Sequence, residues 1–233
     1  MWDNAPLLRG IAGALFAFSA VAALYGATYY TTHLPGLFPL HSVRLEEVPQ
    51  QVDARQVMQV VRSEANGNFF TVDLDKLRGS LEHLPWVRNV SIRREFPDSL
   101  VVRMEEHQAL ARWNGSSLVN KQGEVFSATT DKELPAFSGQ DGTAAEVTQQ
   151  YVQFSQQLGS LNLKVTQLYL SPRHAWQMKL SNGMVLELGR EEMQQRLARF
   201  VEVYPYSLAS MHGSVKYVDL RYRNGFAVGG LTG

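Results

Sequence analysis

Histidine, acidic and hydroxyl side chains are the groups of this chain that could do metal, acid–base or nucleophilic chemistry. The histidines never recur four residues apart, and no HExxH motif occurs, so we expect no metal site. The sequence also contains no GxSxG nucleophile elbow, no P-loop and no GxGxxG turn after a strand. It contains no cysteine, which excludes a disulfide and a thiolate nucleophile. We therefore expect a non-enzymatic protein without a cofactor.

The one run that could suggest acid–base chemistry is Glu105-Glu106-His107, at the end of a predicted strand. Successive side chains of a strand point to opposite faces, so these two carboxylates cannot act as a pair. Arg93 and Arg94 diverge in the same way, and Glu95 follows them. We therefore expect a solvated strand end and a solvated sheet face here, and no catalytic centre.

Composition indicates a folded chain tethered to a membrane. Its 22 basic and 22 acidic residues give a net charge of zero, so the chain as a whole has no excess of positive charge that would indicate nucleic-acid binding. After Arg9 no Asp, Glu, Lys or Arg appears until Arg44, and residues 10–30 are almost wholly apolar or small. Because about 20 helical residues cross the core of a bilayer, residues 10–30 are long enough to span it.

Residues 10–30 are predicted to be an uncleaved transmembrane helix, with residues 1–9 as a cytoplasmic tail and residues 31–40 as an extended linker. The alternative is a cleaved signal peptide, whose apolar region is usually about 7–15 residues and is followed by a small-x-small site that is missing here. Basic residues bias the orientation little. The short tail is more simply left in the cytoplasm while the large C-terminal part is exported.

Residues 41–109 form the first predicted folded module, in the order β-α-α-β-β. Asp53 and Asp73 can each cap a helix with a regular apolar stripe. The stretch "WVRNVSIRREF" and the stretch after Ser99 alternate as strands, so both helices can cover one face of a small sheet. The face that we expect to be apolar carries Trp86, Val90, Ile92 and Phe96.

Residues 110–233 are predicted to be a β-rich α+β domain, so the fold class as a whole is α+β. Helices are expected at 147–158 and 191–204, where apolar residues recur at helical spacing. Short alternating runs predict strands, two of them joined through Ser181-Asn182-Gly183. The stretch "LPAFSGQDGT" is expected to be a loop, and the chain should end in an edge hairpin.

That last hairpin, "SVKYVDLRYRNGFAVG", is the best candidate for a binding site. A final strand is often a sheet edge, and an edge can accept a partner strand through main-chain hydrogen bonds. Alternation is expected to put Val218, Leu220 and Tyr222 on one face, with Asp219 and Arg221 on the other. The alternative, a core face with a plain solvated face, stays open on these residues alone.

The order of these parts, together with several long stretches, resembles the bacterial FtsQ/DivIB family of cell-division proteins over essentially the whole chain. The first module then corresponds to a POTRA domain, the polypeptide-transport-associated fold. One departure is Ala109, where family members often carry proline. The stretches that carry the resemblance are "LPWVRNVSIRREFPDSLVVRMEEHQALARW", "LVNKQGEVFS", "LGREEMQQRLARF" and "YVDLRYRNGFAVG".

The resemblance implies a divisome scaffold subunit of the inner membrane, located at the septum, that links early to late division proteins and helps control septal peptidoglycan synthesis. Its implied partners are FtsB and FtsL, with FtsK, FtsW and FtsI as further divisome contacts. FtsB would add to the last strands, where Arg221 would pair with a carboxylate, Tyr222 would supply apolar area and Gly225 would permit a positive φ. The residues carried over for this contact are Arg221, Tyr222, Asn224, Gly225 and Gly229, with Arg173 as a second cation.

Two alternatives belong to other classes. POTRA modules also occur in envelope proteins that chaperone or translocate polypeptides, but those carry a C-terminal membrane barrel with many strands of about 10 residues. The chain after Trp113 has two predicted helices instead. An anchored peptidoglycan enzyme would need a nucleophile or a metal set that the sequence does not offer. For the divisome scaffold itself, no nucleic-acid partner and no small-molecule substrate are expected.

Overall fold

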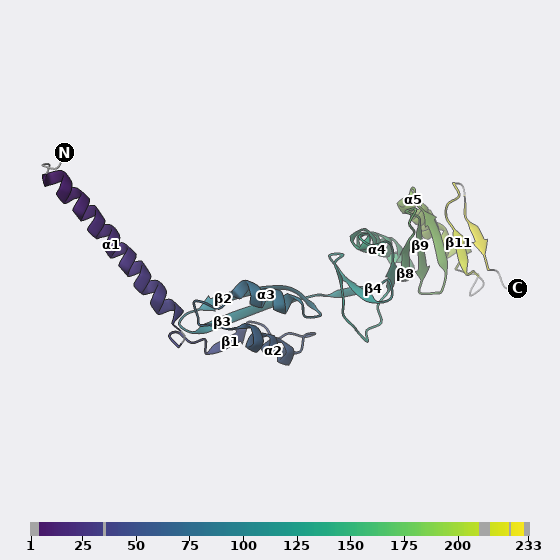
Figure 1. Ribbon diagram of the computed structural model, residues 1–233. Helices are drawn as coiled ribbons and strands as arrows, with labels where there is room; N and C mark the ends of the chain where they lie inside the picture. Colours follow the sequence, from purple (N-terminus) through teal and green to yellow (C-terminus); the bar gives the residue numbers. More distant parts are fainter. Residues whose placement is uncertain (1–4, 35, 210–214, 224, 231–233) are drawn as a thin grey trace. The chain divides into compact units, whose positions relative to one another are not determined.

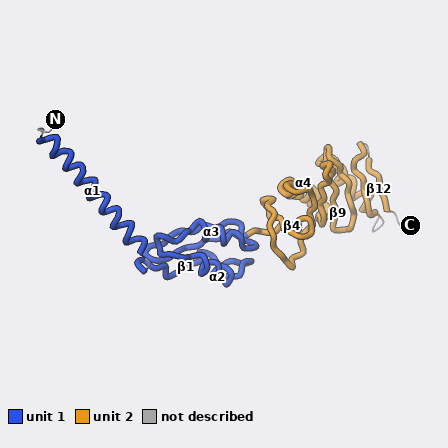
Figure 2. The backbone as a smooth tube through the Cα atoms, viewed as in Figure 1, with its two compact units in different colours: residues 1–106 blue, residues 107–233 orange. Residues whose placement is uncertain are grey.

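The computed structural model describes residues 5–34, 36–209, 215–223 and 225–230. The chain divides into two compact units, Met1–Glu106 and His107–Gly233 (Figure 1, Figure 2). The first unit combines an apolar helix with the β-α-α-β-β module, and the second is a sheet with helices. The α+β fold class expected from the sequence is therefore confirmed.

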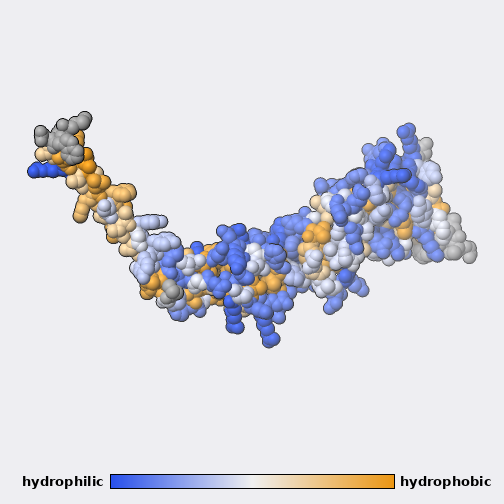
Figure 3. All heavy atoms as spheres, viewed as in Figure 1, coloured by the Kyte–Doolittle hydropathy of each residue, from blue (hydrophilic) through white to orange (hydrophobic). Residues whose placement is uncertain are grey.

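The N-terminal helix α1 spans Ala5–His33, and none of its residues is buried in the protein. Its 29 residues correspond to about 43 Å, close to the full thickness of a bilayer with its headgroups, about 40–45 Å. Figure 3 shows apolar surface along this helix. The helix is thus longer than the predicted apolar segment, because helical hydrogen bonding continues through Thr31, Thr32 and His33.

The module in the first unit is a three-stranded sheet with order β1-β3-β2, in which β1 runs parallel to β3 and β2 runs antiparallel to it. Both helices begin at the predicted caps, since Asp53 Oδ1 accepts from the amide of Arg55 at 2.8 Å and Asp73 Oδ1 accepts from that of Lys76 at 3.0 Å. The elements are β1 Ser42–Leu45, α2 Ala54–Glu64, α3 Leu74–Glu82, β2 Val87–Glu95 and β3 Ser99–Glu106.

The core of this module joins the helix stripes to one sheet face, and Val57, Leu77 and Leu100 in it are fully buried. Phe96 was expected on this apolar face, and that expectation is wrong: its side chain is 75% exposed. Strand β2 ends at Glu95, so the alternation no longer directs the next residue inward.

Two charged residues that were expected to be solvated hold loops of the module instead. The Glu106 carboxylate accepts hydrogen bonds from the amides of Gln50, Gln51 and Val52, at 2.9–3.0 Å. The Arg94 guanidinium donates to main-chain carbonyls of the loop that precedes α3. Neither partner could be found from strand alternation, because both lie in loops that are distant in the sequence.

The second unit is built on a nine-stranded sheet with order β12-β11-β10-β9-β8-β7-β4-β5-β6. The hairpin predicted through Ser181-Asn182-Gly183 is confirmed, because it joins antiparallel strands β9 and β10. The elements are β4 Ala109–Trp113, β5 Ser117–Asn120, β6 Val125–Phe126, β7 Ala136–Ser138, α4 Ala144–Leu158, η1 Gly159–Leu161, β8 Val165–Leu170, β9 Trp176–Leu180, β10 Val185–Gly189, α5 Met193–Ser207, β11 Tyr217–Asp219 and β12 Ala227–Gly229.

The stretch "LPAFSGQDGT" is not only a loop, because it contains strand β7. This strand lies between β4 and β8 and is parallel to both. Phe137 at its centre is fully buried. With only three residues between Pro135 and Gly139, the strand is too short to show an alternating pattern, so its assignment depends on the neighbouring strands.

Helices α4 and α5 contact each other and share one core with the sheet, so they cover the same face of it. The stripe residues Val147, Phe154, Leu197 and Phe200 are fully buried in this core. The opposite sheet face carries partly exposed polar side chains on β9 and β10. Among the residues that the structure describes, no helix covers this second face, and β11 and β12 form one end of the sheet.

Candidate functional site

The candidate site is the edge of the sheet formed by β11 and β12, with the turn that joins them (Figure 2). Strand β11 pairs with β10 in parallel, and β12 pairs with β11 antiparallel, so that Tyr217 faces Gly229 and Asp219 faces Ala227. Within the described residues β12 has no strand on its outer side. Its outward N–H and C=O groups are therefore available to another strand.

An ion pair between Asp219 and Arg221 anchors the start of the turn. Arg221 donates to the Asp219 carboxylate from Nε at 2.9 Å, from Nη2 at 2.6 Å and from its main-chain amide at 3.0 Å. Asp219 lies on the face without helices, as alternation predicts, yet it is buried because Arg221 folds back over it. The pair therefore fixes the direction in which the chain leaves β11.

The pair also sets the charges of the site. Hydrogen bonds from Arg221 hold the pKa of the Asp219 carboxyl below its usual value of 3.8, although burial alone would raise it. The same bonds raise the pKa of the Arg221 guanidinium. Burial, followed by the charge of Asp219, raises the pKa of the Tyr217 hydroxyl. Asp219 and Arg221 are accordingly both ionised at neutral pH, and together they are neutral.

Gly189 at the end of β10 makes room for Arg221. Its φ is +74°, and a Cβ there would lie 3.2 Å from Arg221 Cγ and 2.9 Å from Arg196 Nη1. Arg196 donates from Nη1 to the carbonyl of Leu188 at 2.6 Å, so neither arginine can move without breaking a hydrogen bond. Glycine is thus needed at this position for both its conformation and its size.

Replacing Gly189 by alanine is therefore expected to destabilise the second unit by about 1–2 kcal/mol for the left-handed conformation, with a further loss because Arg221 is displaced. The matched control is Gly183→Ala, since Gly183 has φ +86° and a Cβ there would meet nothing within 4 Å. Urea unfolding of both variants measures the difference. Equal losses in the two would show that Gly189 does not support Arg221.

The turn between β11 and β12 is held by α5, because Arg199 Nη1 donates to the carbonyl of Arg223. This acceptor is neutral, so the bond does not compensate the charge of Arg199. In the described part of the chain, neither Arg199 nor Arg223 has a carboxylate within 4 Å. The turn therefore presents uncompensated positive charge next to the open edge of β12.

Alternation was expected to put Tyr222 on one face with Val218 and Leu220, but β11 does not extend as far as Tyr222. Val218 and Leu220 are buried, but β11 ends at Asp219 and the Tyr222 side chain is 57% exposed. The exposure makes Tyr222 an accessible aromatic side chain beside Arg221. A partner could bury it without disturbing the core of the domain.

The glycines of the hairpin have different surroundings. The φ of Gly225 involves residue 224, which lies outside the described residues, so its positive φ stays a prediction; a Cβ there would meet nothing within 4 Å. At Gly229 a Cβ would make ordinary contact with the Tyr217 ring at 3.5 Å. Gly230 has φ +80° and closely approaches Lys216, a requirement that the sequence did not reveal. Asn224 lies outside the described residues.

Arg173 lies in the turn between β8 and β9, where Ser171 donates its amide to the carbonyl of Ala175 at 2.9 Å. Strand register puts this turn at the same end of the sheet as Gly189 and Arg221, because Trp176 pairs with both Leu170 and Gly189. With strands about 4.8 Å apart, Arg173 and Arg221 are roughly 12 Å apart across the sheet. One partner strand on β12 would not reach Arg173, so this contact needs a second partner segment.

Three residues at this site were not predicted to take part: Asp219 as the acceptor for Arg221, Gly189 as the space for its stem, and Arg199 as the support of the turn. The spacing Asp219-x-Arg221 was a usable signal, because residues two apart on a strand share a face. Nothing in the sequence relates Gly189 or Arg199 to the turn, since both contacts depend on tertiary packing.

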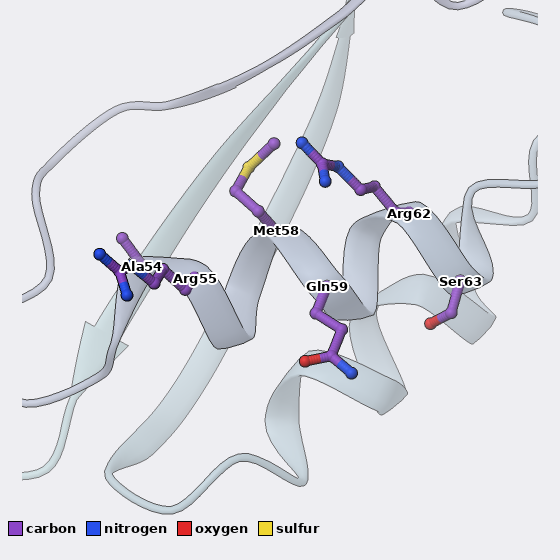
Figure 4. Close-up of a pocket in the computed structure, with 6 residues that line it drawn as sticks. All are labelled: Ala54, Arg55, Met58, Gln59, Arg62 and Ser63. Carbon is purple, nitrogen blue, oxygen red and sulfur yellow. The ribbon is translucent and has the colours of Figure 1, made fainter.

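Other parts of the chain offer less for chemistry. In residues 5–34, 36–209, 215–223 and 225–230, no three His, Asp or Glu side chains are arranged to hold a metal ion. A hollow in the first unit is lined by residues of helix α2, including Arg55, Met58 and Arg62 (Figure 4). Because all of its lining comes from one helix, it is an exposed helix face and not an enclosed cleft.

Comparison with known proteins agrees with the two-domain fold. The family model "POTRA domain, FtsQ-type" matches residues 38–107, and "Cell division protein FtsQ/DivIB, C-terminal" matches residues 111–221. A protein of Nitrosospira multiformis named "Cell division protein FtsQ" is 42% identical over 99% of this chain and 99% of its own length. Proteins of the same name from Burkholderia pseudomallei and Bordetella pertussis are 38% and 36% identical, each over 98% of this chain and over 94% and 92% of their own lengths.

Two family models thus match the module and the sheet domain, in the order in which the structure has them, and the three relatives align over 98–99% of this chain. The apolar helix that precedes both domains is consistent with a single-pass inner-membrane protein. The chain therefore belongs to the FtsQ/DivIB family of cell-division proteins.

Proposed function

We propose that this protein is a non-enzymatic scaffold subunit of the divisome that binds FtsB, and with it FtsL, at the open edge of β12. Family membership supports a role in the divisome. The observation that carries the binding proposal is the edge itself, where a strand without an outer neighbour lies beside the exposed Tyr222 and the cationic turn. A partner strand would gain main-chain hydrogen bonds there and would bury an aromatic side chain.

The charges of the edge favour an acidic partner segment. Arg221 uses Nε and Nη2 for Asp219, which leaves the two N–H groups of Nη1 for a carboxylate of the partner. Arg199 and Arg223 add positive charge at the same turn. We propose that an added FtsB strand carries its acidic side chains here, and that a further segment of the partner crosses the sheet end toward Arg173.

The wider role follows from the anchor. We propose that helix α1 crosses the inner membrane with both folded domains in the periplasm, and that the protein acts at the division septum. It would connect early division proteins such as FtsK, through the POTRA module, to the later proteins FtsW and FtsI, and so help to control septal peptidoglycan synthesis. These contacts rest on the family resemblance, and the edge of β12 is the part argued from geometry.

Depletion of this protein in its own bacterium tests the proposal. We expect cells to grow into filaments with unsplit septa, and wild-type protein supplied from a plasmid to restore division. The Tyr222→Ala variant, produced at the same level, should fail to restore it. Normal division after depletion would overturn the divisome role, whereas full rescue by Tyr222→Ala would overturn the binding site alone.

A further inference from the structure

Four large apolar side chains are exposed together at one end of the POTRA module. Leu37, Phe38, Phe70 and Phe96 are 44%, 41%, 43% and 75% exposed, and we call them the juxtamembrane patch. They come from three segments: the chain after α1, the loop before α3 and the turn between β2 and β3. Figure 3 shows apolar surface at this end of the first unit. Such a cluster on a small module indicates a binding surface.

The patch is held together by the buried ring of Phe69. Phe69 and Phe70 meet edge to face with ring centres 5.1 Å apart, and Phe70 meets Phe38 in the same way at 5.1 Å. Phe69 also contacts the Phe96 ring at 6.2 Å. Phe70 and Phe96 thus share the Phe69 ring as support, and Phe38 packs against Phe70, so rings that are distant in the sequence are linked by ring contacts.

Main-chain hydrogen bonds fix the loops that carry these rings. The amide of Phe69 donates to the carbonyl of Phe38 at 2.9 Å. Arg94 donates from Nε to the carbonyl of Phe69 at 2.8 Å and from Nη2 to that of Val72 at 2.9 Å. The patch is therefore preorganised, and a binding partner need not order it.

Asn68 joins the patch to the end of the membrane helix. Its Nδ2 donates to the carbonyl of Thr32 at 2.7 Å and to that of Leu34 at 3.4 Å, and its side chain is buried. Its Oδ1 accepts from the amides of Phe70 and Thr71, at 2.9 and 3.0 Å. One side chain therefore satisfies carbonyls at the end of α1 and shapes the loop that carries Phe70.

The distance from the bilayer core to the patch is short. If residues 10–30 fill the hydrocarbon, His33 lies about 4.5 Å beyond it. The headgroup layer on each side of a bilayer is roughly 5–7 Å thick, so α1 ends within that layer. Since Asn68 contacts the last turn of α1, the aromatic rings next to it lie at headgroup level, where such side chains are favoured.

The charges around Phe96 do not oppose this placement. The two nearest carboxylates each have a basic group close by: Glu95 lies 3.5 Å from Arg44, and Asp98 lies 3.1 Å from Nδ1 of His41. Anionic lipid headgroups would repel a bare carboxylate, so this pairing lowers the cost of approach.

We propose that the juxtamembrane patch inserts into the lipid interface and docks this end of the POTRA module on the bilayer. The occupant is lipid, because the patch is continuous with the end of the membrane helix and lies at headgroup level. The inference rests on the membrane anchor in the proposed function. Docking would orient the POTRA module relative to the membrane surface, because the patch would hold the module there in addition to helix α1.

Spin labels on the full chain in lipid nanodiscs of phosphatidylethanolamine and phosphatidylglycerol test this proposal, since the protein has no native cysteine. Phe96→Cys and Phe70→Cys each place a nitroxide in the patch and leave the other rings intact. We expect both labels to collide more with oxygen than with a water-soluble nickel chelate, as lipid-exposed labels do. The matched control is Val48→Cys: Val48 is apolar and 86% exposed, and it lies toward the opposite end of the module, where Gln50 bonds to Glu106.

A label at Phe18, in the middle of α1, separates failure of docking from failure of the anchor. If the label at position 18 is exposed to lipid and the label at either patch position is exposed to water, the docking proposal is overturned and the anchor stands. If the label at position 18 is exposed to water, helix α1 is not a membrane anchor, and the docking proposal is overturned as well. Low collision with both reagents at positions 70 and 96 would mean that protein covers the patch, which also overturns lipid docking.

Asn68→Asp gives a second, independent variant. It keeps the Oδ1 acceptor that shapes the loop but replaces the Nδ2 donor with an oxygen that the carbonyls of α1 repel. We expect the module to stay folded by circular dichroism, while the label at position 96 becomes accessible to the nickel chelate. A lipid-like reading that persists unchanged would show that Asn68 does not hold the patch at the membrane, and would overturn that part of the proposal.

Discussion

Tyr222→Ala is expected to weaken capture of purified FtsB by more than about thirtyfold, because a central interface tyrosine contributes roughly 2 kcal/mol or more. The midpoint of thermal unfolding should stay at the wild-type value, since Tyr222 is exposed and lies beyond the end of β11. Titration of FtsB onto immobilised full-length protein in detergent measures the affinity, and scanning calorimetry measures the unfolding.

The matched control is Tyr206→Ala on α5, whose side chain is 87% exposed. It removes the same phenol from the same domain, seven residues further along α5 than Arg199, which supports the turn, so we expect FtsB to bind with wild-type affinity. Loss of binding in both variants would point to a general effect of removing surface tyrosines. Undiminished binding by Tyr222→Ala would place the FtsB site elsewhere on the protein.

Arg221→Gln is expected to destabilise the second unit, because it leaves the buried Asp219 carboxylate without its cationic partner. We expect a loss of about 1–3 kcal/mol, below the range for a fully buried pair because the Arg221 side chain is half exposed to solvent. The matched control is Arg78→Gln, which breaks the exposed pair with Asp75, at 3.1 Å, and should cost less than about 1 kcal/mol.

The loss in Arg221→Gln should depend on pH in a defined direction. The pairing lowers the pKa of folded Asp219, so its contribution is fully present above the usual value of 3.8 and is lost as the pH falls through the lowered pKa. Urea unfolding between neutral pH and about pH 3 should therefore show a gap to the wild type that narrows as the pH falls. The narrowing begins above 3.8, because burial raises the pKa of unpaired Asp219 in the variant, and it continues through the lowered pKa of the wild type. A gap independent of pH would mean that Arg221 stabilises the unit through the packing of its stem against Gly189 and not through its charge.

Charge reversal at Arg221 does not test partner binding alone. From the residues alone, Arg221 was a partner-facing cation, and Arg221→Glu would have been a test of binding. In the structure that substitution would place a second carboxylate against buried Asp219, so loss of binding could reflect a disturbed turn. Tyr222 is the better test of binding, and Arg221 is the better test of how the edge is held.

Local sequence signals account for most of the elements. Asp53 and Asp73 cap their helices as expected, because a cap needs only a side chain within reach of the next amides. The stripe at Val147, Phe154 and Leu158 forms a buried helix face, because helical spacing alone gathers these side chains. Such elements were predictable because the interactions that define them span a few residues.

Local sequence patterns did not predict the elements and contacts that depend on distant parts of the chain. Strand β7 is held by neighbours on both sides, and its three residues carry no pattern of their own. Glu106 and Arg94 were expected in solvent, yet each binds main-chain groups of a remote loop. Polar side chains with long reach find such partners only after the fold has brought the loops to them.

By itself, the sequence determined the order of a membrane helix, a POTRA module and a sheet domain, and it located the terminal hairpin as the binding candidate. These features follow from hydrophobic length, periodicity and turn residues, which act over short distances. Only the tertiary structure decided that Asp219 holds Arg221, that Tyr222 is exposed, and that Asn68 joins the POTRA module to the membrane helix. Those contacts join residues whose positions become fixed relative to one another only when strands and loops pack.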